Sequence, residues 1–103
     1  MKAVLRWRPR ARVDLLEIYA TIALDKPSAA ERWLTKMEEH AVLLAAHPRL
    51  GARSPELIQS ARLLIVGNYL IVYKTHPDTG EGTVDEVEIV RVVHGYRDLS
   101  RVF

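Results

Sequence analysis

The fold is decided by residues 9–47, which read PRARVDLLEIYATIALDKPSAAERWLTKMEEHAVLLAAH. Pro9 suits the first position of a helix, because its fixed φ is helical and its missing N–H is not needed there. Apolar residues then recur at steps of three and four, which gives one apolar face to a helix over about residues 9–25. They are Leu15, Ile18, Tyr19 and Ile22.

A break at residues 25–27, Asp-Lys-Pro, separates this helix from a second one. We expect a capping box after the break, because the side chains of Ser28 and Glu31 can each accept a hydrogen bond from the other's backbone N–H. The second helix ends near His47, since Pro48 disfavours helix in the residue before it. Its apolar face consists of Ala30, Trp33, Leu34, Met37, Ala41 and Leu44. So short a break predicts an antiparallel helical hairpin.

Strands are expected before and after this helical hairpin in the sequence. Gly67-Asn68 supplies the positive φ that a two-residue turn needs, which predicts a β-hairpin around it. Residues 48–61 hold two prolines and a glycine and are expected to be a loop with room for one helical turn. The predicted strands span residues 2–8, 62–66, 69–75 and 83–93, with a longer turn at 77–82. This order predicts one α+β domain over residues 1–103: an N-terminal strand, the helical hairpin on one face, and a three-stranded antiparallel meander.

Composition restricts the class of protein. A chain of 103 residues suits one domain with one modest core. The absence of cysteine excludes disulfides, thiolate zinc sites and a cysteine nucleophile. Because the N-terminus lacks an apolar stretch of signal-peptide length and no apolar run could span a bilayer, we expect a cytoplasmic protein without membrane contact.

No metal or cofactor is expected. The four histidines are scattered along the chain, and none lies four residues from another. They are His40, His47, His76 and His94. The pair Gly80 and Gly82 lacks the strand-to-helix context of a phosphate-binding loop.

Charge is distributed unevenly, although the net charge is only +2. Residues 1–12 carry five basic side chains and no acidic one, whereas residues 76–90 carry five acidic side chains and no lysine or arginine. Two interpretations stay open: ion pairs join the two segments, or the basic segment forms a functional face.

Basic and aromatic side chains gather around the end of the last predicted strand. They are Arg91, His94, Tyr96, Arg97 and Arg101, and we expect Arg62, at the start of the β-hairpin, on the same edge of the sheet. Such a cluster could bind phosphates, stack on bases or assist phosphodiester cleavage. Alternatively, its arginines pair with Asp98, Glu17 or acidic strand residues and only close the sheet. The aromatic side chains of Trp7, Tyr19 and Trp33 are expected in the core.

Four segments carry a resemblance to a known family. They read RARVDLLEIYATIALDKPSAAERWL (10–34), HPRLGARSPEL (47–57), ARLLIVGNYLIVYK (61–74) and VEIVRVVHGYRDL (87–99). In order and spacing they resemble the ParE branch of the ParE/RelE toxin superfamily, whose fold is a helical hairpin packed on an antiparallel sheet. RelE-like members cleave messenger RNA in the ribosome's decoding site, whereas ParE-like members generally inhibit DNA gyrase without catalysis.

The resemblance favours the ParE activity. A RelE-like nuclease would use Arg62, His94, Tyr96 and Arg97 here. However, the position of the C-terminal tyrosine in these nucleases matches Phe103, which has no hydroxyl. The resemblance also implies a basic pair in the loop before the β-hairpin. This loop contains no lysine and offers only Arg49 and Arg53, which are too basic to accept a proton near neutrality. The resemblance therefore implies a gyrase inhibitor without catalytic residues. Its candidate target contacts are Arg62, Arg91, His94, Tyr96, Arg97, Arg101 and Phe103.

The resemblance also implies a ParD-like antitoxin, whose flexible C-terminal segment folds onto the toxin and forms a hetero-oligomer with it. DNA would be contacted only through gyrase or the antitoxin. We expect docking in the groove along the helical hairpin and the adjoining sheet, at Tyr19, Trp33, Met37, Arg49 and Arg53. Two alternatives stay open: a RelE-like ribosome-dependent endonuclease, and a repurposed member that binds only its antitoxin and helps to repress its operon.

Overall fold

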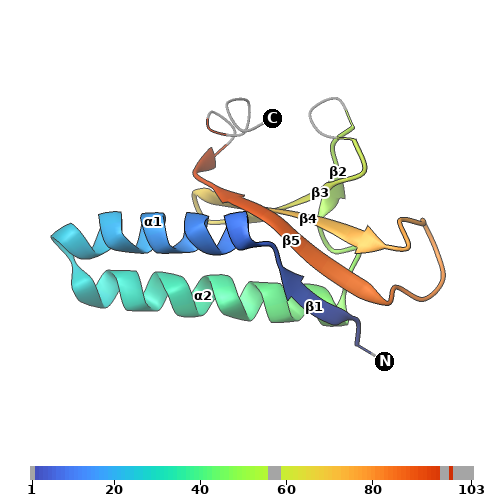
Figure 1. The fold of residues 1–103 in the computed structure, drawn as a ribbon, viewed down its shortest axis with the longest axis horizontal. Coiled ribbons are helices and arrows are strands. Elements are labelled where there is room, and N and C mark those ends of the chain that lie inside the picture. Colours follow the sequence, from blue (N-terminus) through green and yellow to red (C-terminus); the bar gives the residue numbers. More distant parts are fainter. Residues whose placement is uncertain (1, 56–58, 96–97, 99–103) are drawn as a thin grey trace.

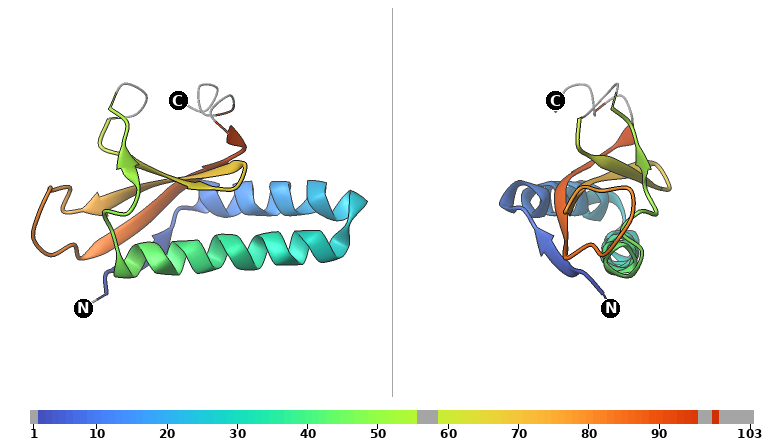
Figure 2. Two further views of the ribbon diagram at one scale, coloured as in Figure 1. Left: turned by 180° about the vertical axis from the view of Figure 1, so that it is seen from behind. Right: turned by 90° about the vertical axis from the view of Figure 1, so that its right-hand side faces the viewer.

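The computed structural model describes residues 2–55, 59–95 and 98. Its elements are β1 (Val4–Trp7), α1 (Pro9–Asp25), α2 (Pro27–Ala46), β2 (Ala52–Arg53), β3 (Arg62–Val66), β4 (Tyr69–His76) and β5 (Glu86–Val93). The strands form one sheet in the order β1-β5-β4-β3-β2, and the two antiparallel helices lie side by side against it (Figures 1 and 2). The α+β class and the helical hairpin are therefore confirmed.

The first strand joins the sheet in parallel with the last one. Val4 pairs with Glu86 and Trp7 with Ile89, so β1 covers only the first half of β5. Side chains of the basic and the acidic segment meet here: Arg6 donates to Glu86 at 3.0 Å and Arg8 to Glu88 at 2.8 Å. The ion pairs expected between the two segments are thus present and hold β1 in register.

Several expected bounds differ from the structure. The first strand spans Val4–Trp7 rather than residues 2–8, and β4 ends at His76 rather than at residue 75. The last strand begins at Glu86 rather than at residue 83, because its partner β4 ends at His76. Pro77 follows and has no N–H to continue the ladder. The loop at 48–61 contains the two-residue strand β2, which pairs with the start of β3. Such a short strand carries no periodic signal in the sequence.

The expected capping box at Ser28 and Glu31 is wrong. The helix α2 begins at Pro27, its N-cap is Lys26, and no side chain caps it. Proline at the first helical position starts this helix as it starts α1, because its φ is already helical. The Glu31 carboxylate accepts a hydrogen bond from the Tyr19 hydroxyl on α1 instead.

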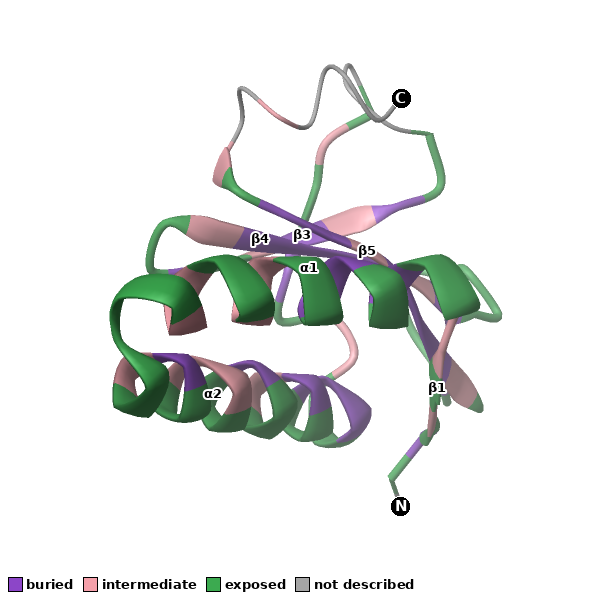
Figure 3. Cartoon of the chain, turned by 60° about the vertical axis from the view of Figure 1, so that its left-hand side comes forward, coloured by how far each residue is buried: buried purple, intermediate pink, exposed green. Residues whose placement is uncertain are grey.

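The core lies between the helices and the sheet, where the inward faces are buried (Figure 3). Its largest fully buried side chains include Tyr73, Met37 and Leu44. The tryptophans Trp7 and Trp33 are half-buried and pack against this cluster, as expected of core aromatics. No helix in the described part of the chain is long and apolar enough to cross a membrane.

Candidate functional site

The structure separates Arg62 from the end of β5. Arg62 opens β3 opposite Tyr73, whereas His94 follows β5 and stacks against Tyr69 at the other end of β4. The expectation of a shared edge was wrong, because strands on either side of a common antiparallel neighbour run in the same direction. The start of β3, with Arg62, therefore lies at the same edge of the sheet as the start of β5, and the end of β5 lies at the opposite edge. Four further candidates lie outside the described residues: Tyr96, Arg97, Arg101 and Phe103.

Arg62 belongs to a hydrogen-bonded clamp that holds the loop after α2. Its Nη1 donates to the Gly51 carbonyl at 2.8 Å. The Tyr73 hydroxyl accepts from the Gly51 N–H and donates to the Pro48 carbonyl, both at 2.8 Å. Burial is the main cause that raises the pKa of the Tyr73 hydroxyl, so it stays protonated and can donate. Arg62 therefore has a structural task in this conformation.

Arg91 is also bound internally. Its Nε and Nη2 donate to the two carboxylate oxygens of Asp14 on α1, at 2.8 and 3.0 Å. The exposed fractions of the two side chains are 17% for Arg91 and 5% for Asp14. Asp14 also accepts the Val92 N–H at 2.9 Å, on the part of β5 that β1 does not cover. The Asp14 carboxylate thus accepts the Val92 N–H in place of a backbone carbonyl, which β1 would supply only if it extended further along β5.

The sequence did not indicate this partner for Arg91, for which Asp98, Glu17 or acidic strand residues were expected. The two residues of the pair are 77 positions apart, so no local pattern connects them. A signal was nevertheless present, because Asp14 falls on the inward apolar face of α1 beside Ala11 and Leu15, which are also buried. A carboxylate on a buried face needs a charged partner.

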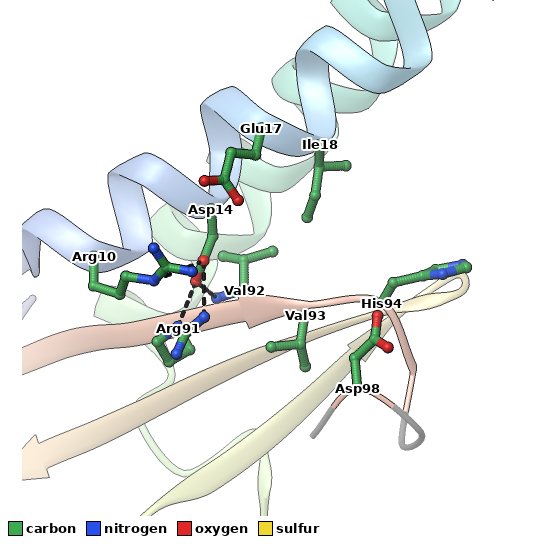
Figure 4. A pocket seen from close by; sticks show the side chains of 9 residues that line it. All are labelled: Arg10, Asp14, Glu17, Ile18, Arg91, Val92, Val93, His94 and Asp98. Atoms are coloured by element: carbon green, nitrogen blue, oxygen red, sulfur yellow. Dashed lines mark hydrogen bonds and ion pairs between the residues drawn. The ribbon is translucent and has the colours of Figure 1, made fainter. Parts of the chain in front are cut away.

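A cavity of about 400 Å³ adjoins this ion pair, between α1 and the end of β5 (Figure 4). It is lined by Arg10, Asp14, Glu17, Ile18, Arg91, Val92, Val93, His94 and Asp98. His94 is exposed, and its ring centroid lies 4.8 Å from that of Tyr69, which in turn lies 5.3 Å from that of Trp33. Of the predicted target contacts, the structure brings together Arg91 and His94. The cavity can receive polar and aromatic side chains of a partner.

The candidate antitoxin contacts are only partly exposed. Met37 is fully buried, so it cannot contact a partner in this conformation. Arg49 donates to the Thr79 and Gly82 carbonyls at 3.1 and 3.0 Å, and Arg53 pairs with Asp78. These two arginines hold the loop between β4 and β5. The expectation of Tyr19 in the core was wrong: it lies at the surface, where it lines an apolar cavity of about 270 Å³ together with Arg12, Leu15, Leu16 and Leu34.

A second charged cluster lies where β1, β5 and β4 adjoin. His76, Glu86 and Glu88 each place a possible metal-ligand atom within 4.8 Å of the others, which the scatter of histidines along the sequence did not indicate. The His76 Nε2 lies 3.0 Å from Glu88 Oε1. Arg8 donates to both oxygens of the same carboxylate, from Nε to Oε2 at 2.8 Å and from Nη2 to Oε1 at 3.3 Å. Because Arg6 and Arg8 already balance both carboxylates, we interpret the cluster as an ion-pair network.

This network predicts an acid-sensitive contribution to stability. The hydrogen bond from Arg8 is the main cause that lowers the pKa of Glu88 from 4.5 to about 2. A carboxyl whose pKa is depressed in the folded state stabilises that state above its unfolded pKa and loses the effect as pH falls through the folded pKa. We therefore expect the wild type to unfold at a higher temperature than Glu88→Gln at pH 7. The difference should shrink as the pH falls from 4.5 to about 2. Circular dichroism melts across this range measure it, and a constant difference would contradict the assignment.

Comparison with known proteins identifies the family. The sequence profile described as "ParE toxin of type II toxin-antitoxin system, parDE" matches residues 5–99. Toxin ParE1 of Mycobacterium tuberculosis is 33% identical over 94 residues, which cover 90% of each chain. A protein of Sinorhizobium fredii, named only as a candidate toxin, is 33% identical over 100 residues, which cover 95% of this chain and 94% of the relative.

Two solved structures share the fold. The chromosomal ParDE system of P. aeruginosa contains a chain with a TM-score of 0.72 and 22% identity, covering 91% of this chain and 97% of that one. The toxin–antitoxin complex RelBE2 of M. tuberculosis contains one with a TM-score of 0.66 and 23% identity, covering 91% and 99%. The family profile and the 33% identity decide the assignment. The chain therefore belongs to the ParE family of toxins from type II toxin–antitoxin systems.

Proposed function

We propose that this toxin inhibits DNA gyrase in the cytoplasm and is neutralised by a ParD-like antitoxin, with which it forms a hetero-oligomer. The observation that carries the non-enzymatic part is the bond between Arg62 and the Gly51 carbonyl. The resemblance implies that RelE-like nucleases use basic residues for charge stabilisation and acid–base work, and Arg62 matches their arginine in the β-hairpin. Here its guanidinium holds a loop.

The other basic side chains of the loop support the same proposal. Arg49 and Arg53 bind the turn between β4 and β5, and neither can accept a proton near neutrality. Phe103 supplies no hydroxyl for acid–base work. These features argue against phosphodiester cleavage by the usual superfamily residues, and an inhibitor that acts by binding requires none of them.

Support for the antitoxin comes from the relatives. The matched profile describes toxins of a parDE system, and one of the similar solved structures is a toxin–antitoxin complex. In this proposal, DNA is contacted only through gyrase or the antitoxin. Among the described residues, His94 at the rim of the 400 Å³ cavity is the most accessible of the candidate target contacts. The proposed contacts continue at Tyr96, Arg97, Arg101 and Phe103.

A supercoiling assay tests this function. We expect the purified chain to inhibit the supercoiling of relaxed plasmid by gyrase and ATP, and to trap cleaved DNA. Addition of the cognate antitoxin should restore supercoiling, because it covers the toxin.

The same preparation added to translating ribosomes provides the contrast. Intact gyrase activity together with message cut in the decoding site would contradict the proposal and support a RelE-like endonuclease. If neither activity is present and cells that express the chain grow normally, the chain acts only as a partner of its antitoxin.

A further inference from the structure

The helix α1 is apolar on two opposite faces. Its inward face packs on the core through residues such as Ala11 and Leu15. On the opposite side, a second apolar row recurs at steps of three, four and four residues and is here called the outer stripe: Val13, Leu16, Ala20 and Leu24. All four are exposed, and Figure 3 shows an exposed side of α1 that faces neither α2 nor the sheet. A contiguous apolar row at the surface usually marks an interaction site.

The outer stripe has a protruding side chain near one end and a cavity near the other. Leu24 protrudes, with an exposed fraction of 89%, the highest of the large apolar side chains in the described part of the chain. The cavity, of about 270 Å³, lies beside the first half of the stripe and is lined by Arg12, Leu15, Leu16, Tyr19 and Leu34. It is large enough for a leucine side chain. Two copies of the stripe can therefore fill each other's cavities, provided that the two α1 helices run antiparallel.

An antiparallel arrangement brings the two outer stripes into register. When a twofold axis passes through the middle of the stripe, Val13 lies level with Leu24 of the second copy. Leu16 then lies beside Ala20 of the second copy, whose small side chain allows the helices to approach closely. The Leu24 side chain also lies beside Arg12 and Leu16 of the other copy, which line its cavity. Every residue of the stripe thus meets an apolar residue of the second stripe.

The charges of α1 also favour the antiparallel pair. Its first turn contains no acidic residue and its last turn no basic one, so the helix does not balance its own dipole. In the same register, Arg12 lies level with Asp25 of the second copy, at the negative end of that helix dipole. Neither side chain has a hydrogen-bonded or ionic partner among the described residues. The arrangement therefore brings opposite charges to the same level at both ends of the contact.

Glu17 is the charged residue nearest to the twofold axis. Its side chain lines the cavity between α1 and the end of β5, so it is directed toward the sheet and away from the outer stripe (Figure 4). The middle of the contact is consequently formed by the apolar side chains of Leu16 and Ala20.

We propose that the chain forms a weak homodimer through the outer stripe, with the α1 helices antiparallel, Leu24 in the cavity of the other copy and Arg12 paired with Asp25. The proposal goes beyond the proposed function, because self-association requires neither gyrase nor the antitoxin. The stripe rises about 17 Å along α1, at about 1.5 Å per residue. A contact made by one helix of each copy falls below the roughly 1,200 Å² of stable interfaces, so we expect a dissociation constant on the order of 10–100 µM.

Leu24→Lys is the main test. Sedimentation equilibrium of the chain alone, from about 1 to about 500 µM, should show the mass of wild type rising from 11.7 kDa towards twice that value. The substitution introduces a charge into the apolar contact, beside Arg12 of the second copy, so we expect the dissociation constant to rise at least ~30-fold. Because Leu24 is so exposed, the melting temperature should stay nearly unchanged. Val42→Lys on α2, at an apolar residue that is 53% exposed, is the matched control and should change the constant less than ~3-fold.

Charge reversal tests the register. Arg12→Glu or Asp25→Lys alone places like charges level with each other, so we expect each to raise the dissociation constant about 3–10-fold at low ionic strength. The double variant restores opposite charges and should dimerise within about 2-fold of wild type. A double variant as weak as the two single effects combined would contradict the antiparallel register.

Cross-linking locates the contact directly, because the chain contains no cysteine of its own. An equal mixture of Val13→Cys and Leu24→Cys should form a disulfide-linked dimer on mild oxidation, whereas either variant alone should not. The two thiols of a single variant would lie about 17 Å apart along the helices, too far for a disulfide.

Three outcomes would overturn the proposal. The first is a wild type that stays at 11.7 kDa over the whole concentration range. The second is a dimer that Leu24→Lys leaves intact and that the cysteine mixture does not cross-link, since such a dimer uses another surface. The third is a monomeric wild type whose Leu24→Lys variant binds the antitoxin more weakly, which would assign the outer stripe to that interface.

Discussion

Replacement of Asp14 by alanine is expected to lower the free energy of unfolding by about 3–5 kcal/mol, the largest loss from any single substitution considered for this chain. The change leaves the Arg91 guanidinium, only 17% exposed, without its carboxylate. It also leaves the Val92 N–H without the acceptor that it has on the uncovered part of β5. Urea denaturation followed by circular dichroism measures the loss.

Two variants serve as comparisons for Asp14→Ala. Glu17→Ala removes an exposed carboxylate from the same helix and should cost less than about 0.5 kcal/mol. Asp14→Asn keeps an oxygen for the Val92 N–H but loses the charge, so its stability should fall between the other two. Equal stabilities for Asp14→Ala and Glu17→Ala would show that the buried ion pair does not stabilise the fold.

The second large effect is expected at Gly51. A Cβ at this position would lie 2.7 Å from Tyr73 Cε1, 2.8 Å from the Tyr73 hydroxyl oxygen and 2.8 Å from the Leu63 carbonyl oxygen. Because Tyr73 is fully buried and two of its hydrogen bonds hold this loop, neither side can move away freely. We expect Gly51→Ala to cost about 3 kcal/mol.

Gly80→Ala is the matched control, because a Cβ at Gly80 would meet nothing within 4 Å. Its free energy of unfolding should stay within about 0.5 kcal/mol of wild type. Similar denaturation midpoints for the two alanine variants would mean that the clamp around Tyr73 yields easily and that Arg62 is not fixed by it.

Local patterns predicted the elements well. The prolines at positions 9, 27 and 48 fix where the helices start and stop, and Gly67-Asn68 fixes the β-hairpin. These signals lie within a few residues of the structure that they determine. The parallel pairing of β1 with β5 joins residues about 80 positions apart, and no periodicity encodes it. Only the opposite charges of the two segments indicated that they meet.

The candidate site was harder to predict, because a residue type does not reveal which partner it binds. Arg62 and Arg91 looked alike in the sequence, as basic residues near strand ends. Packing gives each an internal acceptor, the Gly51 carbonyl and the Asp14 carboxylate. The exposed apolar side of α1, which carries Val13, Leu16 and Leu24, was also missed. Its positions in α1 alternate with those of the inward face, so the helix read as having a single apolar side.

We propose that the chain arrests growth by acting on gyrase, without cutting RNA. The most direct measurement is the recovery of covalent gyrase–DNA complexes from cells that express the chain, with and without the antitoxin, alongside sequencing of ribosome-bound message ends. We expect the complexes to accumulate with the chain alone and to disappear when the antitoxin is co-expressed, while message ends stay unchanged. Growth arrest with message cut in the decoding site and no gyrase–DNA complexes would contradict it.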